Sequence, residues 1–415
     1  MITVQTVPSN LLISPEFSNF TKANLLADGV FSVYLNTNGG NVAIGGGDYG
    51  AQTINTLSMD ASLQGFIKNT LSRLSQFVNI DFQFNSDSKN TDLNFYLDTK
   101  IDIGGSGTTL GIALENSQPN HNWWEVILNT PALASNTSYL HYATIHELGH
   151  VLGLEHPFDS SDGDVFISSD PTKGAYPEDT VMAYRSPEGV QWPDWYSVND
   201  IQALVTLWGA RLQVYTSAND KIIGQDFNEK LDGAGGQDTL VVHGKSSEYS
   251  FTVQNGTSFL TDNIYGRDGM DTLTNIERIQ FTDGTVTADL ATTINNSTIY
   301  RLYQAAFARM PDEAGLRFWT SQSNSGQSIE NISQAFLSAP EFTQRYGANL
   351  SNAQYVDQLY LNVLGRSGEA NGVSYWNEVL NTGQATKDTV LIGFATSSEN
   401  VLRTADHISH GFFIG

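Results

Sequence analysis

Residues 141–157 read His141-Tyr-Ala-Thr-Ile-His146-Glu147-Leu-Gly-His150-Val-Leu-Gly153-Leu-Glu-His156-Pro157. His146 and His150 are four residues apart, so on a helix they lie on one face and can reach one metal ion. Gly153 has no Cβ, can adopt a positive φ, and can therefore end the helix and turn the chain so that His156 becomes a third ligand. Three imidazoles favour zinc and leave a coordination position open for water. Glu147 can stand beside that water as general base.

Two simpler interpretations of this stretch are weaker. Histidines merely buried on a helix would leave Glu147 as an unpaired acid among apolar neighbours, which proteins seldom tolerate. A purely structural zinc site usually closes with a fourth strong ligand, often cysteine, and the chain contains no cysteine. The pattern therefore favours a catalytic metal.

A second segment, Thr180-Val181-Met182-Ala183-Tyr184, follows downstream. Together with the extended histidine motif it resembles the Met-turn of the metzincin proteases. Pro157 after the third histidine and Tyr184 two residues after Met182 resemble the serralysin subfamily of secreted bacterial zinc endopeptidases. The resemblance implies a protein or peptide substrate and gives Met182 the role of a soft floor beneath the histidines. It also implies that Tyr184 is a fifth, displaceable zinc ligand that stabilises the transition state.

Strand patterns over residues 29–35, 80–84, 93–97, 108–114 and 124–128, with an amphipathic helix over 60–77, precede the histidine helix. This order resembles the α+β metzincin catalytic domain, which we place at residues 1–212. The resemblance implies that residues 108–114 form an antiparallel edge strand to which substrate adds. We expect the histidine helix to cover residues 139–152 with Ser138 as N-cap. Residues 1–28 are either a short pro-segment or the first covering segment of the domain.

Acidic turns suggest calcium as a second cofactor. Asp159, Asp162 and Asp164 surround a glycine turn and could supply oxygen ligands, although a solvated acidic loop explains them equally well. Residues 232–240 and 266–273 resemble the calcium-binding nonapeptide of RTX proteins, with Asp238 and Asp271 at its acidic position. Both copies lack the second glycine, so structural turns are an open alternative. These segments predict a small β module over residues 213–292.

The last part of the chain, residues 293–415, contains an internal repeat. Four positions recur 57 residues later, and they are Tyr303, Arg309, Gly315 and Trp319 against Tyr360, Arg366, Gly372 and Trp376. The segment resembles a helical repeat domain of unknown function that is appended to secreted bacterial proteins. We expect an all-α domain for anchoring, partner binding or export, and hence a multidomain protein overall.

The composition of the chain excludes some classes of binding partner. The formal net charge is −24, which argues against nucleic acid or an anionic membrane as a partner. Without cysteine there are no disulfides, and no apolar run approaches a membrane span. The N-terminus has no Sec-type signal pattern. By the resemblance we expect secretion through an uncleaved C-terminal type I signal, since residues 411–415 are apolar as such signals are.

A non-enzymatic class remains as the rival hypothesis. The chain could be a calcium-stabilised cell-surface or adhesion protein whose protease domain is vestigial or processes a single partner. The intact Glu147 favours the enzyme, because a decayed site would lose its base. Chelator-sensitive proteolysis separates the two hypotheses.

Overall fold

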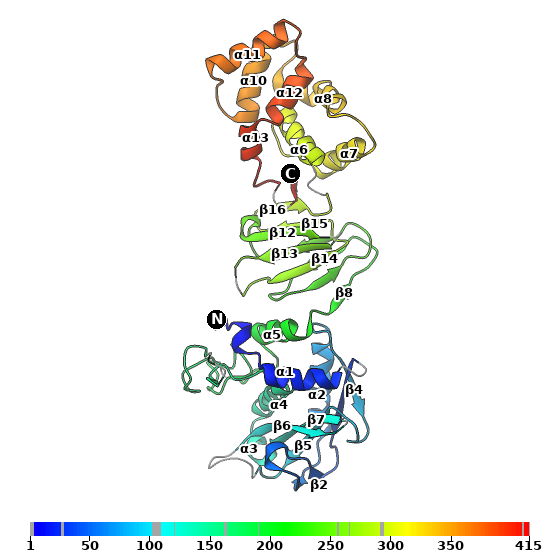
Figure 1. Ribbon diagram of the computed structural model, residues 1–415, viewed down its shortest axis with the longest axis vertical. Helices are drawn as coiled ribbons and strands as arrows, with labels where there is room; N and C mark the ends of the chain where they lie inside the picture. Colours follow the sequence, from blue (N-terminus) through cyan, green and yellow to red (C-terminus); the bar gives the residue numbers. More distant parts are fainter. Residues whose placement is uncertain are drawn as a thin grey trace. The chain divides into compact units, whose positions relative to one another are not determined.

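The computed structural model describes residues 4–25, 29–101, 109–119, 121–161, 163, 165–189, 191–254, 257–264, 266–290, 294–408 and 411–414. The protein is multidomain, with a β-rich N-terminal region and an all-helical C-terminal region (Figure 1). Contacts between residues divide the chain into two compact units. Unit 1 comprises Met1–Gln213, Gln225–Lys230 and Tyr265–Gly269, and unit 2 comprises Val214–Gly224, Leu231–Ile264 and Met270–Gly415.

A seven-stranded sheet forms the centre of unit 1. Its strands are β1 (Val30–Leu35), β2 (Gly40–Ile44), β3 (Gln52–Thr56), β4 (Asp81–Asn85), β5 (Leu93–Asp98), β6 (Gly111–Gln118) and β7 (His121–Asn129). Strands β4, β1, β5 and β7 are parallel neighbours, and β6 pairs antiparallel with β7 at the edge. Strand β5 is buried along its whole length, as expected where both faces of a parallel sheet are covered.

The glycines of residues 39–50 favour a loop, but the segment also contains a strand. Val42 and Ile44 lie in β2, which forms a hairpin with β3. The glycines serve the connection, where Gly46 has a φ of 72° and leads into the 3-10 helix η2 (Gly47–Tyr49). The apolar alternation of β2 therefore outweighed the glycines beside it.

Helices pack around this sheet. They are η1 (Ser9–Leu11), α1 (Pro15–Leu25), α2 (Ala61–Leu74), α3 (Thr130–Leu133), α4 (Thr137–Val151) and α5 (Val198–Trp208). Of the apolar side chains on the predicted face of α2, Leu63, Ile67, Leu71 and Leu74 are buried, whereas Phe66 is half-buried. The N-cap of α4 differs from the expectation. Asn136, two residues before Ser138, accepts the hydrogen bond from the Tyr139 N–H, so the helix begins earlier.

Glu115 on β6 provides a test of electrostatics in unit 1. Burial, with the charges of Glu16 and Asp48, raises the pKa of Glu115 to about 7. A carboxyl whose pKa is raised on folding stabilises the fold below its unfolded pKa of about 4.5, and this stability is lost as the pH rises through 7. Since Glu115 is partly exposed, we expect Glu115→Gln to raise the free energy of unfolding by only about 1 kcal/mol at pH 8.

The gain should vanish near pH 4, where both proteins carry a neutral side chain. Thermal unfolding followed from pH 4 to 8 measures it. The control is Asp87→Asn, because Asp87 is an exposed carboxylate of the same unit. A gain of equal size at pH 4 and pH 8 would contradict the electrostatic cause.

Within the described part of the β module, ten strands form two five-stranded sheets. One sheet has the order β12-β13-β14-β10-β8 and the other β17-β16-β15-β11-β9. Their bounds are β8 (Leu212–Val214), β9 (Lys221–Ile223), β10 (Lys230–Asp232), β11 (Thr239–Val241), β12 (Tyr249–Gln254), β13 (Thr257–Asp262), β14 (Met270–Thr274), β15 (Arg278–Phe281), β16 (Gly284–Thr287) and β17 (Phe412–Ile414), with the 3-10 helix η3 (Ser246–Glu248) before β12. Aliphatic side chains such as Ile222, Leu240 and Ile279 form the core of the module.

Eight helices form the C-terminal region in the described residues. They are α6 (Ile294–Phe307), α7 (Glu313–Asn324), α8 (Ile329–Leu337), α9 (Pro340–Tyr346), α10 (Asn352–Leu364), α11 (Ala370–Asn381), α12 (Lys387–Ala395) and α13 (Ser398–Arg403). One apolar core unites side chains from both halves of this region, including Phe336 on α8 and Phe394 on α12.

The residues of the 57-residue repeat make matching contacts in both copies. Arg309 forms an ion pair with Glu341, and Arg366 forms one with Glu399. Each arginine also lies over the ring of its repeat tyrosine, at 5.1 Å for Tyr303 and 5.4 Å for Tyr360. The glycine of each copy has no room for a side chain beside that tyrosine, because a Cβ on Gly315 or Gly372 would meet its hydroxyl. The repeat therefore records a duplicated structural motif.

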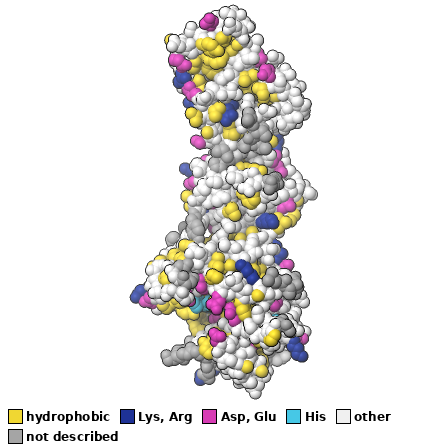
Figure 2. All heavy atoms as spheres, in the orientation of Figure 1, with side chains coloured by type: hydrophobic (Ala, Val, Ile, Leu, Met, Phe, Trp, Pro, Cys, Tyr) yellow, Lys and Arg dark blue, Asp and Glu magenta, His cyan; other side chains and the backbone are white. Residues whose placement is uncertain are grey.

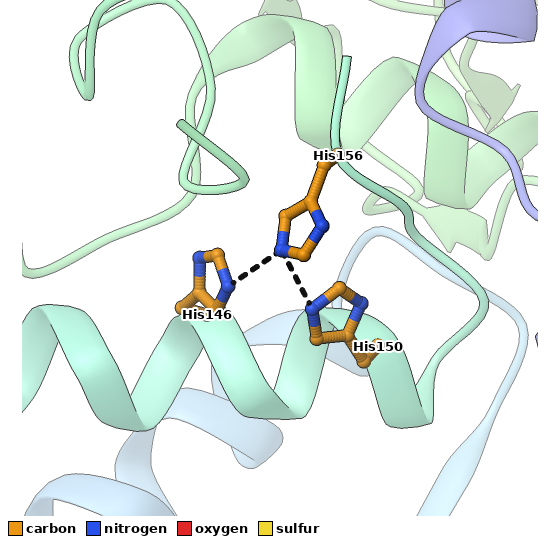
Figure 3. Close-up of side chains that lie close together, drawn as sticks. All are labelled: His146, His150 and His156. Atoms are coloured by element: carbon orange, nitrogen blue, oxygen red, sulfur yellow. Dashed lines mark hydrogen bonds between the residues drawn. The ribbon is translucent and has the colours of Figure 1, made fainter. Parts of the chain in front are cut away.

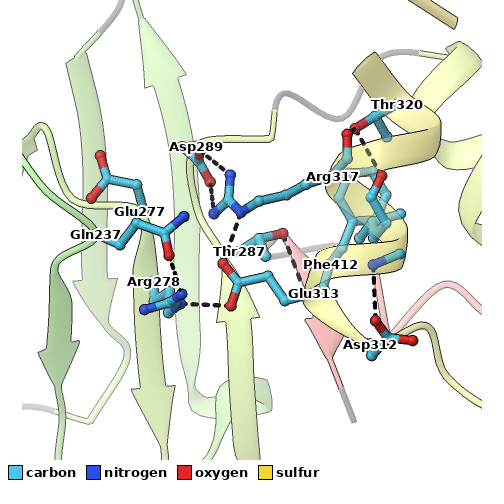
Figure 4. A network of polar contacts seen from close by, with 12 residues as sticks. Gln237, Glu277, Arg278, Thr287, Asp289, Asp312, Glu313, Arg317, Thr320 and Phe412 are labelled. Carbon is cyan, nitrogen blue, oxygen red and sulfur yellow. Dashed lines mark hydrogen bonds and ion pairs between the residues drawn. The ribbon is translucent and has the colours of Figure 1, made fainter. Parts of the chain in front are cut away.

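Polar and apolar contacts hold the β module and the helical region together within unit 2. Figure 4 shows Arg278 on β15 bonded to Glu313 at the start of α7, while Arg317 contacts both Glu313 and Asp289. Although burial opposes it, the two arginines hold the pKa of Glu313 below its usual value. Strand β17 adds an apolar contact, since it pairs with β16 and its Phe412 stacks on Tyr300 of α6.

Candidate metal centre

The three histidines of the motif converge on one point. His146 and His150 come from successive turns of α4, and His156 comes from the segment that follows (Figure 3). The Nε2 of His156 lies 3.2 Å from the Nε2 of His146 and 3.1 Å from that of His150. Tetrahedral zinc with bonds of about 2.0–2.1 Å separates its ligand nitrogens by roughly 3.3 Å, so the spacing suits that ion.

The turn after α4 brings His156 into place. Gly153 has a φ of 99°, as predicted for the residue that reverses the chain. The N–H of Leu154 then bonds to the Gly149 carbonyl, which closes the end of the helix. A Cβ on Gly153 would lie 2.8 Å from the Cβ of Ser18 on α1, so the position has no space for a side chain.

Backbone carbonyls fix the orientation of two rings. The Nδ1 of His146 lies 2.7 Å from the Val181 carbonyl and the Nδ1 of His150 lies 2.9 Å from the Leu154 carbonyl. A carbonyl only accepts, so each Nδ1 carries the proton and each Nε2 presents a lone pair. Burial lowers the pKa of His146 to about 3 and that of His150 to about 4, so both rings are neutral at physiological pH.

These lone pairs define the chemistry of the site. Burial also lowers the pKa of His156 well below its usual value, so this ring is neutral as well. At most one of the two short contacts made by its Nε2 can be a hydrogen bond, because a ring nitrogen carries one proton at most. A cation between the three nitrogens would satisfy all of them. The donor set therefore fits a borderline divalent metal.

Glu147 lies beside the triad in the same helix. It is buried, and burial raises its pKa to about 8. Gly111 at the start of β6 faces it so closely that a Cβ there would lie 2.5 Å from the Glu147 Oε1. The carboxyl therefore occupies the space that a side chain on the edge strand would fill. A nearby divalent cation would favour the ionised form of this group.

The segment Thr180–Tyr184 passes next to the histidines. A Cβ on Gly149 would lie 2.7 Å from the Met182 sulfur, so Met182 packs against α4 between the two helical histidines. Its neighbour Val181 supplies the carbonyl that orients His146. Tyr184 is 56% exposed, with its ring 5.5 Å from that of His146 and 4.6 Å from that of His156. The structure thus brings together all six residues predicted around the metal: His146, Glu147, His150, His156, Met182 and Tyr184.

A buried carboxylate anchors this segment, although we did not anticipate its role in the site. Asp200 in the first turn of α5 is fully buried and accepts hydrogen bonds from Thr180 Oγ1 at 2.5 Å and from the Val181 N–H at 3.0 Å. It also closes a capping box with Ser197 at the start of α5. The backbone of Val181 thereby links the two residues, because its N–H bonds to Asp200 and its carbonyl to His146. Only the tertiary contact reveals this link.

We expect Asp200→Asn to lower the zinc affinity of the protein about 10- to 100-fold. The NH₂ group of the asparagine would face the Thr180 hydroxyl or the Val181 N–H, which are themselves donors to Asp200. The backbone of Val181, whose carbonyl orients His146, would then be held less firmly. Competition with a chromophoric chelator measures the affinity. The matched control is Asp194→Asn, an exposed position six residues upstream, and equal effects of the two changes would contradict the proposed link.

A cavity of about 410 Å³ opens beside the triad. His146 and Glu147 line it together with the aromatic residues Tyr139, Tyr142 and Trp192. Gly111, the first residue of the edge strand β6, also lines it. A chain added to β6 would therefore run past Glu147.

The N-terminal segment covers the back of the histidine helix. Phe17 on α1 packs edge-on against His150 at 5.5 Å, and Thr21 on the same helix donates a hydrogen bond to the Val151 carbonyl. Leu12 is buried in the same core. Of the two interpretations of residues 1–28, the described part, residues 4–25, fits the covering segment.

The acidic residues proposed for calcium are scattered. Asp159 is exposed, and its carboxylate accepts from the Ser161 N–H in a local turn. Asp162 and Asp164 lie outside the described residues. Asp238 and Asp271 are both buried, but Asp238 precedes β11 and Asp271 lies in β14, in the other sheet.

The β module contains further acidic positions that we missed. Asp220, Glu229 and Asp238 are nine residues apart, and each lies two residues before a buried aliphatic side chain. This nine-residue spacing could have indicated these positions from the sequence alone. In unit 2, Asp238 accepts the Asp220 N–H and Glu277 accepts the Asp238 N–H, each at 2.8 Å. The Asp238 Oδ2 is buried with no hydrogen-bond partner in the described part of the chain, so a cation ligand could use it.

Surface features agree with the composition. On the face drawn in Figure 2, the Lys and Arg side chains of the described residues lie singly and form no basic patch. None of the described helices has the length and apolar character needed to cross a membrane.

Comparison with known proteins identifies one region. Residues 287–342 and 333–404 match the family model of a domain of unknown function (DUF4214). The C-terminal helical region therefore carries this domain, and the two matched ranges parallel the internal repeat. No curated protein matches the chain. The match lies outside residues 1–212, so the chemistry of that region is inferred from its own residues.

Proposed function

We propose that the protein is a zinc-dependent endopeptidase of the metzincin type, related most closely to the serralysins. The observation that carries the proposal is the convergence of three neutral imidazoles, His146, His150 and His156, with the buried Glu147 beside them. The packing of Met182 beneath the histidines and of Tyr184 at their side supports the same function. The edge strand β6 gives an extended peptide a place to bind.

The residues divide the chemistry between them. His146, His150 and His156 would hold the zinc, which when bound polarises the scissile carbonyl and lowers the pKa of a water molecule. Glu147 takes the proton from the attacking water and passes it to the leaving amine. Tyr184 is protonated at neutral pH, because a tyrosine hydroxyl has an ordinary pKa of about 10. Its hydroxyl can then donate a hydrogen bond to the oxyanion.

The remaining parts of the proposal concern the setting of the enzyme. We propose that it is secreted, that the β module binds calcium as a degenerate RTX-type module, and that the helical region contacts a surface or secretion partner. The unpartnered Asp238 Oδ2 supports a cation in the module. The acidic net charge of −24 suits an extracellular protein that binds cations.

Metal analysis joined to a proteolysis assay tests the proposed function. The full-length protein should contain about one zinc ion in the triad, should cleave casein, and should lose the activity to 1,10-phenanthroline and regain it on addition of zinc. Calcium chelation alone should leave the zinc in place. A zinc-loaded protein that cleaves no member of a peptide library would refute the enzyme and favour the adhesion hypothesis.

A further inference from the structure

The aromatic ring of Phe158 supports two groups of the metal centre at once. It stacks on the His156 imidazole with ring centroids 4.8 Å apart and planes inclined by only 7°. The same ring meets that of Tyr184 at 5.0 Å and 57°. Phe158 itself follows His156 by two residues and is held in a turn, because the Asp159 N–H bonds to the His156 carbonyl.

Tyr184 depends on ring contacts for its position. Its hydroxyl makes no hydrogen bond to any described residue, and more than half of the residue is exposed. Its ring neighbours are His146, His156 and Phe158, and the first two are metal ligands in the proposed function. An exposed tyrosine without a hydrogen bond exchanges between staggered rotamers unless a neighbour blocks them. Of these three ring neighbours, Phe158 is the one that is not a proposed metal ligand, so it can serve to block the other rotamers of Tyr184.

We propose that Phe158 is a positioning residue that holds the Tyr184 ring against His156, so that the hydroxyl points to the reacting carbonyl. The inference rests on the proposed function, because it assigns Tyr184 as the donor to the oxyanion. Phe158 makes no contact with the substrate in this role. It acts by restricting the rotamers of Tyr184.

The first test needs no catalysis. Full-length protein is treated with tetranitromethane, and nitration of each tyrosine is followed by mass spectrometry. In Phe158→Ala, Tyr184 should be nitrated at least about threefold faster than in the parent protein, because its ring is no longer shielded on one side. Tyr49 and Tyr375, which are 54% and 57% exposed, are internal controls and should react at unchanged rates. An unchanged Tyr184 rate would overturn the proposal.

The second test uses a double-mutant cycle. Phe158→Ala should lower kcat about tenfold with little change in KM and with zinc content retained, because a displaced donor weakens transition-state stabilisation alone. In a Tyr184→Phe background the same change should have no further effect, since the donor is already absent. Phe158→Leu keeps much of the side-chain volume, so its kcat should lie between that of the parent protein and that of Phe158→Ala.

The outcomes separate the two proposals. An equal loss of kcat in both backgrounds, or a loss of zinc, would show that Phe158 acts through His156 and would overturn its role toward Tyr184. A parent protein without peptidase activity would refute the proposed function. The nitration result would still decide whether Phe158 holds the Tyr184 ring.

Discussion

Replacing Glu147 by glutamine is expected to lower the rate of peptide hydrolysis by at least about 10³-fold while the zinc stays bound. The amide cannot accept the proton of the attacking water, whereas the three imidazoles proposed to hold the metal are untouched. Glutamine matches glutamate in size, so it fits the space against Gly111 where a Cβ would lie 2.5 Å from the Glu147 Oε1. Casein cleavage and metal analysis of the same sample measure the two quantities.

The matched control for this prediction is Glu188→Gln, an exposed glutamate on the segment that follows Tyr184. It should retain the parent rate. A Glu147→Gln protein that still cleaves casein would exclude the general-base role. Loss of the zinc would instead show that Glu147 supports the metal centre structurally.

Replacing Phe412 by alanine should lower the free energy of unfolding of unit 2 by about 3–5 kcal/mol. Phe412 is fully buried in the core of the helical region, where it stacks on Tyr300 at 5.4 Å. Its neighbour Phe413 belongs to the core of the β module, so β17 contributes to both cores. The cavity left by the ring would therefore weaken the contact between two parts of one unit.

Differential scanning calorimetry of the full chain measures this effect, which corresponds to a fall of roughly 10 °C in the Tm of unit 2. The zinc affinity of unit 1 should be unchanged, because no residue of the triad belongs to unit 2. Phe318→Ala is the control, since Phe318 lies in the same unit and is 53% exposed. Equal shifts for the two variants would contradict the role assigned to β17.

Local patterns of apolar residues predicted many of the helices and strands. The helical spacing of Leu63, Ile67 and Leu71 predicted α2, and short alternating runs predicted β1, β4, β5 and β7 within a few residues. The hairpin of β2 and β3 was missed, because its glycines suggest a loop while its pairing depends on partners in β5. The N-cap of α4 was misplaced for a similar reason, as Asn136 and Ser138 are equally good cap residues until the chain direction is known.

The candidate calcium positions show the limit of motif matching. Asp238 and Asp271 share the local pattern Gly-x-Asp-Thr-Leu, yet one precedes a strand of one sheet and the other lies within a strand of the second. The nine-residue spacing of Asp220, Glu229 and Asp238 is a property of the sequence, but it does not coincide with the glycine pattern of the two nonapeptide-like segments. Which acidic residues lie side by side depends on the register between neighbouring strands. That register is set by strand pairing, as between β11 and its neighbours β9 and β15, rather than by the sequence of any one turn.

The sequence by itself determined the donor atoms of the candidate metal centre and the turn that delivers the third, because ligand chemistry, helical periodicity and a glycine at positive φ are local properties. Only the tertiary structure decided how those donors are held. The carbonyl of Val181 that orients His146, the Asp200 carboxylate behind it and the Phe158 ring beside Tyr184 are not set by local pattern. Hydrogen bonds and packing between residues distant in sequence form only when the whole chain has folded, so no local pattern encodes them.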